Sequence, residues 1–348
     1  MAWPRLPVTR LPEESARIVR LMQAAAAHLA LDLEGLTVLT EAGTNAYAVT
    51  PVLAALAGST TVYALTSDSS FGSSEEACRQ VEELSEAAGL DEGRIRFVTD
   101  RGCIPPGIDV VTNLGFVRPI DREILGKLSA FGVVSCMHES WEVRSEDVDL
   151  QACRELGIAV AGVCEDFDGM DVFQSCGQLA VKICLEAGLE VAGNKIVVMS
   201  SDRFGPVIVA ALRANLADVR LLATAGELEK AGSGNDAVVV ADYLAEQPAI
   251  DGGEEALEEF AAANPASTFV QFAGALPLDR LRALGLRVHP GKPLEPRRMM
   301  FTLAHLGPRP VVYLHAAGLK VGELLWRRGA QQKPLGPYAS LVQELWMA

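Results

Sequence analysis

The sequence predicts an α/β protein made of two doubly wound, parallel-sheet domains of the Rossmann or flavodoxin type. Short and nearly continuous apolar runs, such as LTVLTEA (36–42) and NDAVVVADYL (235–244), alternate with amphipathic helical patterns along most of the chain. These runs end in loops rich in Gly, Ser, Thr, Asn or Asp, as the strands of a buried sheet do. The length of 348 residues gives room for about two domains of ordinary size.

The composition fits a globular protein and narrows the class of partner. Hydrophobic residues make up 49% of the chain and charged residues 22%, which is ordinary for a folded protein with a sizeable core. The 45 acidic residues outnumber the 30 basic ones and give a formal net charge of -15. A nucleic acid is therefore excluded as the main partner, because a phosphate backbone requires a basic face.

Targeting and cysteine patterns indicate a cytoplasmic protein. No apolar run approaches the roughly 18 residues of a membrane span. The first residues, MAWPRLPVTRLPEESARIV, are too polar for a secretory signal. The seven cysteines are scattered and form no Cys-x-x-Cys pair, which favours reduced core cysteines over disulfides or a zinc site. We expect a soluble protein with no membrane partner.

The first domain is predicted to span residues 1–168. It begins with a helix that contains His28, which we expect to be structural. Further apolar runs predict strands, and the amphipathic segments between them predict helices on both faces of a parallel sheet. The predicted strands cover 36–42, 60–66, 94–100, 108–115 and 133–137, and the predicted helices cover 49–58, 75–89 and 118–132.

The second domain is predicted to span residues 169–318, with 319–348 returning to the first domain as terminal helices. RPVVYLHAAG (309–318) is predicted to be its last strand. Ligands of open parallel sheets bind beyond the carboxyl ends of the strands, so two such sheets predict a cleft between the domains. The other predicted strands cover 194–200, 218–225, 235–244, 267–274 and 286–291, and the main helices cover 170–193, 206–216 and 253–264.

VVMSSDRFGPV (197–207) has the outline of a nucleotide-binding turn: an apolar strand, a short polar loop and a helix. In such turns the first glycine allows a tight bend, the second lets the backbone approach the pyrophosphate, and the third lets the helix pack on the strand. Gly205 matches the third glycine, whereas Ser200 and Asp202 replace the first two. Ser201, Arg203 and Phe204 complete the candidate cofactor-binding turn.

Asp202 makes dinucleotide binding the open question. Its carboxylate would lie where a pyrophosphate sits, and two like charges about 4 Å apart repel by several kcal/mol at a partly buried site. Attraction by the helix N-terminus, at most ~2 kcal/mol, does not cancel this repulsion. Either Arg203 turns inward and compensates, or Asp202 caps the helix. Thr224 also stands where an acid would bind the ribose, and Glu227 comes only later.

Three residues are candidates for acid–base chemistry. His315 follows the apolar run PVVYL, where a strand-end histidine would face the cleft as general acid or base. The alternative is a histidine bonded to the backbone. His138 and Glu139, in MHESWE (137–142), also follow a predicted strand, and a His beside an acid is a candidate base. Adjacent residues of an extended chain point in opposite directions, so both face one ligand only if the chain turns.

The substrate-binding candidates are small polar residues in loops. Thr44 and Asn45 in GTNAY and Ser67 in SDSSFGSS would bind a small anion or a hydroxyl-rich group, and ordinary turn chemistry is the alternative. Asp168 belongs to the acidic segment CEDFDGMD (164–171) at the domain crossover. Such carboxylates hold a divalent cation or act as hinge and capping groups. We predict no metal site.

The order of these features resembles the D-2-hydroxyacid dehydrogenases of the formate and glycerate dehydrogenase type. The segment 146–163 resembles the family's exit from its catalytic domain, and 191–214 resembles its cofactor strand and turn. The segment 309–325 resembles the late strand that carries its catalytic histidine. A weaker likeness, Asp166-Phe167-Asp168-Gly169, is to the Lys-Phe-Asp-Asn of S-adenosylhomocysteine hydrolases.

The resemblance implies an NAD(P)-dependent oxidoreductase acting on a small polar substrate of the hydroxy- or keto-acid kind. It implies NAD or NADP at 200–205, His315 as acid/base and a homodimer. The family's substrate-binding arginine has no counterpart after STFVQFAG (267–274). The alternative is a divergent protein that keeps the fold, has lost the dinucleotide, and serves as a repurposed enzyme or small-molecule-binding protein. The two replaced glycines, the missing ribose acid and the missing arginine favour it.

Overall fold

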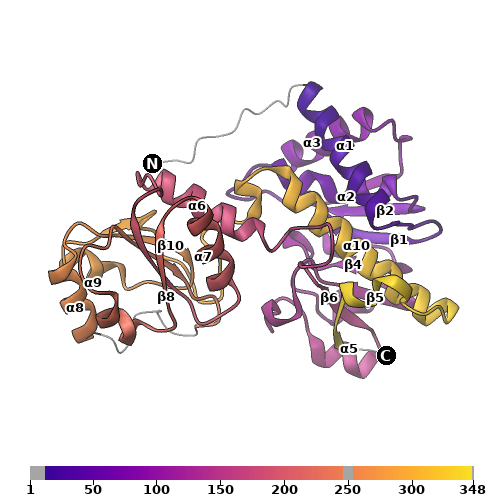
Figure 1. Ribbon diagram of the computed structural model, residues 1–348. Coiled ribbons are helices and arrows are strands. Elements are labelled where there is room, and N and C mark those ends of the chain that lie inside the picture. Colours follow the sequence, from indigo (N-terminus) through magenta and orange to yellow (C-terminus); the bar gives the residue numbers. More distant parts are fainter. Residues whose placement is uncertain (1–11, 246–253, 347–348) are drawn as a thin grey trace. The chain divides into compact units, whose positions relative to one another are not determined.

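The computed structural model describes residues 12–245 and 254–346, and the chain divides into two compact units (Figure 1). Unit 1 comprises Met1–Val172 and Gly307–Ala348, and unit 2 comprises Phe173–Leu306. The return to unit 1 begins at Gly307, 12 residues before the expected position of 319, because the long helix that follows packs on the sheet of unit 1.

The sheet of unit 1 has seven strands in the order β12-β6-β5-β4-β1-β2-β3. β1 lies between β2 and β4, with Thr37 paired to Thr61 and Val38 to Val110. Neighbouring strands are parallel, except that β12 runs antiparallel to β6 at one edge. The strands are β1 (Thr37–Glu41), β2 (Thr61–Leu65), β3 (Ile95–Val98), β4 (Ile108–Thr112), β5 (Leu128–Ser135), β6 (Val160–Val163) and β12 (Val342–Trp346).

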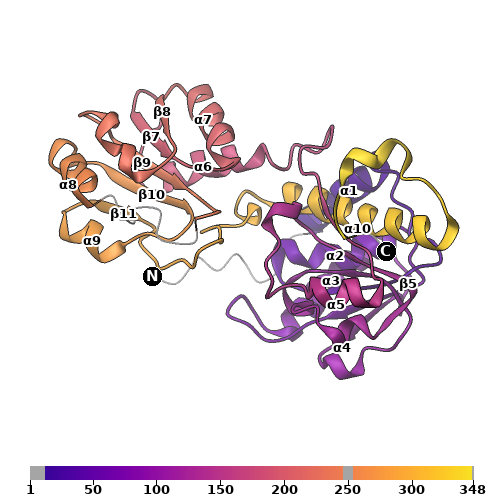
Figure 2. The ribbon, with the colours of Figure 1, turned by 90° about the horizontal axis from the view of Figure 1, so that it is seen from below.

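Helices cover both faces of this sheet (Figures 1 and 2). One face carries α1 (Pro12–His28), α2 (Val49–Leu56), α3 (Ser74–Ala87) and α10 (Pro308–Gln331). The other face carries α4 (Arg122–Leu125) and α5 (Leu150–Leu156), whose apolar side chains share a core with Leu39, Val111 and Val134. The crossovers from β1 to β2 and from β4 to β5 therefore lie on opposite faces. This places the topological switch point, where ligands of such sheets bind, between β1 and β4.

Unit 2 has a five-stranded parallel sheet in the order β11-β10-β9-β7-β8, with its switch point between β7 and β9. Helices α6 and α7 cover one face, while α8, α9 and the 3₁₀ segment η5 close a second core on the other face. The strands are β7 (Lys195–Met199), β8 (Asp218–Leu222), β9 (Ala237–Ala241), β10 (Thr268–Ala273) and β11 (Arg287–His289). The helices are α6 (Ser175–Glu186), α7 (Phe204–Ala214), η5 (Ala225–Ala231), α8 (Glu254–Ala263) and α9 (Leu278–Ala283).

The predicted α/β class with two parallel-sheet units is confirmed, and several local predictions are wrong. The segment 309–318 is helix α10 and not a strand. Its apolar run is buried against the sheet of unit 1 in a helix of 24 residues, so tertiary packing overrides the β-branched composition. The predicted helix 118–132 shrinks to α4 because β5 begins at Leu128. Residues 342–346 form β12 instead of a terminal helix, and α6 begins only at Ser175.

Within the described parts of the chain, no helix combines the length and apolarity that crossing a bilayer requires.

Candidate functional site

The turn after β7 is held by the side chain of Asp202. Its Oδ1 accepts the backbone N–H of Phe204 at 2.9 Å and the hydroxyl of Ser200 at 3.1 Å. Its Oδ2 accepts the backbone N–H of Tyr243, after β9, at 2.7 Å. The carboxylate therefore spans the switch point of unit 2, from the start of α7 to the loop of the neighbouring strand.

These contacts bear on the two alternatives for Asp202. Its carboxylate bonds to the N–H of Phe204 at the start of α7, as a capping group does, and the guanidinium of Arg203 lies over the ring of Phe173, 4.6 Å from the centroid. Burial raises the pKa of Asp202, although the N–H groups of Phe204 and Tyr243 oppose that shift. The nearby carboxylate of Asp242 raises the pKa further.

The other residues of the turn, Ser201, Phe204 and Gly205, also make close contacts within unit 2. Ser201 donates its hydroxyl to Asp242 Oδ1 at 2.7 Å, and Asp242 itself is buried. Phe204 packs in the core, stacked on Phe173 with 5.4 Å between ring centroids. Gly205 keeps the role of the third glycine, since a Cβ there would lie 2.9 Å from the Cβ of Ser200.

The donor set of this turn does not fit a pyrophosphate. A phosphate at a helix N-terminus is bound by free backbone N–H groups, and here the Phe204 N–H is already bonded to Asp202. Two carboxylates, Asp202 and Asp242, stand beside those donors. At the end of β8, Thr224 is exposed, and Glu227 Oε2 accepts the N–H of Ala223 at 2.9 Å. The carboxylate of Glu227 therefore lies at the end of β8, although the residue itself comes three positions after Thr224.

In unit 1, His138 is bonded through both ring nitrogens. Asn113 Oδ1 accepts the N–H of Met137 at 2.7 Å, which fixes the amide so that its Nδ2 donates to His138 Nε2 at 2.6 Å. His138 therefore carries its proton on Nδ1, which donates to the carbonyl of Glu139 at 3.0 Å. Burial lowers the pKa of His138 to about 4, so the ring is neutral at pH 7 and neither nitrogen is left for a ligand.

Glu139 points away from His138 into the protein, as the alternation of an extended chain requires. The side chain is fully buried and joins three segments. Its Oε2 accepts the indole N–H of Trp141 at 2.5 Å, and its Oε1 accepts from Glu165 N and Gln343 Nε2, each at 3.2 Å. The residue ties the loop after β5 to the loop after β6 and to β12.

His315 lies inside α10 and not at the end of a strand. It is buried, and its Nδ1 lies 2.6 Å from the hydroxyl of Thr50 on α2, with the ring of Tyr47 5.8 Å away between centroids. Burial lowers its pKa to about 3, which keeps the imidazole neutral. The expected strand-end position of this histidine is therefore wrong, because the apolar run before it is helical.

The expected substrate-binding residues of unit 1 lie in two loops that one hydrogen bond connects. Thr44 donates its hydroxyl to the carbonyl of Phe71 at 3.3 Å, which joins the loop after β1 to the loop that begins at Ser67. Asn45 is exposed, has a positive φ of 58° and donates its N–H to Gln80 at 2.6 Å. Ser67 is exposed as well.

In the acidic segment after β6 (164–171), the described contact of the candidate residue is made by its backbone and not by its side chain. Asp168 uses its backbone carbonyl as acceptor for the ring of His28, at 2.8 Å. Among residues 12–245 and 254–346, no three His, Cys, Asp or Glu side chains are grouped so that they could hold a metal ion.

Sequence reasoning missed Glu41, the last residue of β1. It is 6% exposed, and its Oε2 accepts the N–H of Phe116 at 3.1 Å, across the switch point of unit 1. Burial raises its pKa to about 7, against the lowering effects of Phe116 and Arg118. A carboxylate that ends an apolar strand next to a glycine loop, LTVLTEAGT (36–44), is the sequence signal that identifies it.

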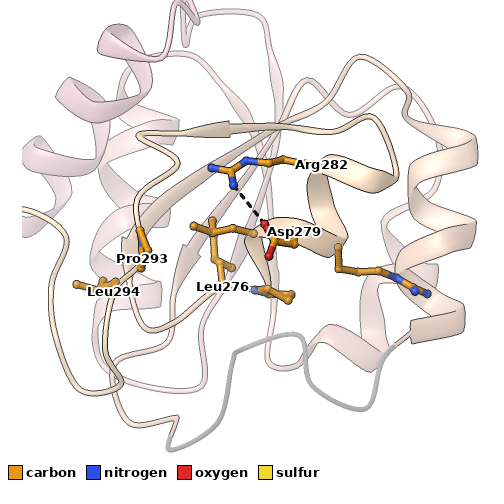
Figure 3. A pocket seen from close by; sticks show the side chains of 8 residues that line it. Leu276, Asp279, Arg282, Pro293 and Leu294 are labelled. Atoms are coloured by element: carbon orange, nitrogen blue, oxygen red, sulfur yellow. Dashed lines mark hydrogen bonds and ion pairs between the residues drawn. The ribbon is translucent and has the colours of Figure 1, made fainter. Parts of the chain in front are cut away.

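A shallow hollow of about 430 Å³ lies beyond β10 in unit 2 (Figure 3). Its lining includes Leu276, Asp279, Arg282, Pro293 and Leu294. Arg282 contacts Asp279 at 3.4 Å and donates to the carbonyl of Gly291 at 2.8 Å, so its guanidinium already has partners within the protein. The lining combines apolar side chains with the charged groups of Asp279, Arg280 and Arg282.

No protein-family model and no curated protein sequence matches the chain. Several solved structures do match the chain in fold. A dipicolinate synthase subunit from Bacillus halodurans aligns with a TM-score of 0.56 and 11% identity over 84% of this chain and 99% of that one. The corresponding dipicolinate synthase polypeptide from Bacillus subtilis aligns with a TM-score of 0.56 and 12% identity over 87% and 99%. NAD-dependent formate dehydrogenase from Staphylococcus aureus, in complex with NAD, aligns with a TM-score of 0.45 and 14% identity over 84% and 94%.

The chain has the fold of these two dipicolinate synthase proteins. The architecture expected from the resemblance to D-2-hydroxyacid dehydrogenases, two parallel-sheet α/β units in one chain, is thereby confirmed as a fold. At 11 to 12% identity the likeness carries neither a substrate nor a cofactor over to this chain.

Proposed function

We propose that this chain is a divergent protein of the dehydrogenase-like fold that acts on a small polar molecule without binding a dinucleotide at its β7 turn. The observation that carries the proposal is the position of the Asp202 carboxylate. It accepts the N–H of Phe204, the donor that a pyrophosphate would need, and reaches the N–H of Tyr243 across the switch point. A dinucleotide would have to displace both hydrogen bonds and approach a carboxylate at the same time.

An NAD(P)-dependent oxidoreductase acting on a hydroxy- or keto-acid is the second candidate, and two observations favour it. Gly205 keeps the close helix–strand packing of a cofactor turn, with its Cβ position 3.0 Å from Leu221 Cδ1. The carboxylate of Glu227 lies at the end of β8, where an acid binds the adenosine ribose in this fold. On this reading the pyrophosphate would bind with Asp202 protonated or displaced.

Titration of the full chain with NAD(H) and NADP(H), by calorimetry and nicotinamide fluorescence, separates the two. We expect no binding to the wild-type protein at millimolar cofactor. Asp202→Gly should gain measurable affinity because it frees the N–H groups and removes the charge, and Asp202→Asn should gain less because it keeps the bulk. Asp279→Asn, which removes an exposed carboxylate of the same unit, is the matched control and should behave as wild type. Micromolar binding by the wild-type chain would sink the proposal and establish the second candidate.

A further inference from the structure

The switch point of unit 1 holds a buried carboxylate with one oxygen unused. Glu41 Oε2 accepts the N–H of Phe116, whereas Oε1 makes no hydrogen bond to any described residue. No described cation forms an ion pair with this carboxylate either: Arg118, the basic residue that acts on its charge, is bonded to Asp147 at 3.0 Å. A carboxylate oxygen without a donor in the protein can accept a hydrogen bond from a ligand.

Glycines flank the carboxyl group of Glu41 in the loop after β1 and in the loop after β4. A Cβ at Gly115 would lie 2.8 Å from Oε2, and a Cβ at Gly43 would lie 3.6 Å from Oε1. Only glycine at 115 leaves the carboxylate where it is, and Gly43 places no side chain of its own beside Oε1. A second polar atom at this sheet edge, Thr66 Oγ1 after β2, is buried without a hydrogen-bond partner.

The polar side chains nearest to Glu41 on the neighbouring strands are bonded to other partners. The register that pairs Leu39 with Val111, continued by two residues, places Asn113 opposite Glu41. Asn113 is fixed by Met137 and His138, and the only proton of the neutral His138 ring is donated to Glu139. Glu41 Oε1 is therefore an acceptor at the switch point of unit 1 to which neither Asn113 nor His138 donates a described hydrogen bond.

We propose that Glu41 is the ligand-contacting residue of a small-molecule site at the carboxyl ends of β1 and β4, and that its Oε1 receives the primary ammonium group of the ligand. An ammonium supplies both the missing hydrogen bond and the missing counter-charge, and a short charge-assisted hydrogen bond is stronger than one to a hydroxyl. The net charge of -15 raises the local concentration of cations. The site goes beyond the proposed function and does not depend on whether unit 2 binds a dinucleotide.

The test uses ethanolammonium chloride as probe, with choline chloride at equal ionic strength as a cation that has no N–H donor. The full chain is labelled with ¹³C at the glutamate carboxyl, and the Glu41 resonance is assigned by its loss in Glu41→Gln. We expect ethanolammonium to move the Glu41 titration to lower pH, because the bound cation favours the ionised carboxyl. By calorimetry, Glu41→Gln should weaken binding of the probe about tenfold or more.

Two further variants make the result independent of how well Glu41→Gln folds. Gly115→Ala forces the carboxyl from its position and should also weaken binding. Glu34→Gln, an exposed carboxylate before the other end of β1, should bind as wild type does. Identical Glu41 titrations in ethanolammonium and choline, or probe binding that survives in Glu41→Gln, would overturn the site. An equal response to ethylene glycol would overturn the cationic class of the ligand. Since the cofactor titration reports on Asp202 in unit 2, either proposal can fail without the other.

Discussion

Asp202 and Glu41 are two carboxylates at equivalent places, the switch points of their sheets, and their surroundings differ. Asp202 receives three hydrogen bonds, two from backbone N–H groups and one from Ser200. Glu41 accepts the N–H of Phe116, and the adjacent N–H of Gly115 also lowers its pKa. A carboxylate that accepts several hydrogen bonds from the protein stabilises the turn around it. A carboxylate with an oxygen that no protein group bonds can accept a hydrogen bond from a ligand. This difference is why we assign structure to the first and ligand binding to the second.

Glu41 should make the stability of unit 1 depend on pH. Burial raises its pKa from 4.5 to about 7, so the folded chain holds the proton over a range in which the unfolded chain has released it. The free energy of unfolding therefore falls as the pH rises through that range, by about 3 kcal/mol in total. Glu41→Gln cannot ionise, and urea unfolding at pH 4 to 8 should show a flatter profile for this variant, with a gain over wild type above pH 7.

Glu34→Gln serves as the control for that profile, because its carboxylate is exposed and should leave the wild-type pH dependence in place. Parallel profiles for wild type and Glu41→Gln would show that the Glu41 carboxyl titrates as an ordinary exposed group and is not desolvated.

At the level of the site, the sequence identified the β7 turn and Asp202 but could not decide what the carboxylate does. A side chain two residues before a helix either caps it or points outward, and the deciding partner, Tyr243, lies 41 residues further along the chain. The same limit applies to His138. Its tautomer depends on Asn113, which no local pattern connects to it.

Helix α10 is the element that the sequence pattern misjudged most. PVVYL has the composition of a strand, and its helical form is stabilised by packing against β4, β5 and β6. The contact with the sheet is very close: a Cβ at Gly322 would lie 2.4 Å from Val110 Cγ1. Small residues on this face therefore belong to the helix–sheet interface. A helix packed against a sheet and a strand within that sheet can have the same apolar composition. Only the fold shows that this run is the helix.

Two glycines of α10 provide a matched test of that packing. Gly322→Ala should destabilise unit 1 by about 1–3 kcal/mol, since the added methyl overpacks the interface with Val110. Gly329→Ala should stabilise it by up to about 1 kcal/mol, because Gly329 is exposed, its nearest atom would be Phe131 Cδ1 at 3.7 Å, and alanine favours the helix. Chemical denaturation of the two variants measures both signs. Stabilisation by Gly322→Ala would show that the helix does not sit this closely on β4.

Several buried parallel strands of both units were predicted from the sequence. Buried parallel strands are continuous apolar runs, and β1, β2, β7 and β9 lie within the ranges that such runs indicated. The shortened α4 and the antiparallel β12 were not predictable, because the segment LSAFG between α4 and the apolar end of β5 and the segment VQELW carry no period that separates helix from strand.

At the scale of the whole molecule, the two units have separate hydrophobic cores. The core cluster built on Leu39, Val111 and Val134 belongs to unit 1, and the one built on Val197, Val238 and Phe269 belongs to unit 2. Units that each bury their own apolar surface are expected to unfold as separate cooperative transitions. The chain enters unit 2 after Val172 and leaves it before Gly307, so unit 2 is one continuous segment.

Calorimetry of single-site variants tests that independence. Gly322→Ala should lower the melting temperature of one transition, and Gly205→Ala should lower that of the other, because its Cβ would meet Ser200 Cβ at 2.9 Å and Leu221 Cδ1 at 3.0 Å. Each variant should leave the other transition where wild type has it, and the double variant should show both shifts unchanged, since the effects of uncoupled sites add. Adding Ser200→Gly to Gly205→Ala removes one of the two close contacts and should restore part of the loss. A single transition that moves with both substitutions would show instead that the chain unfolds as one cooperative body, and ligand binding at the Glu41 site would then stabilise unit 2 as well as unit 1.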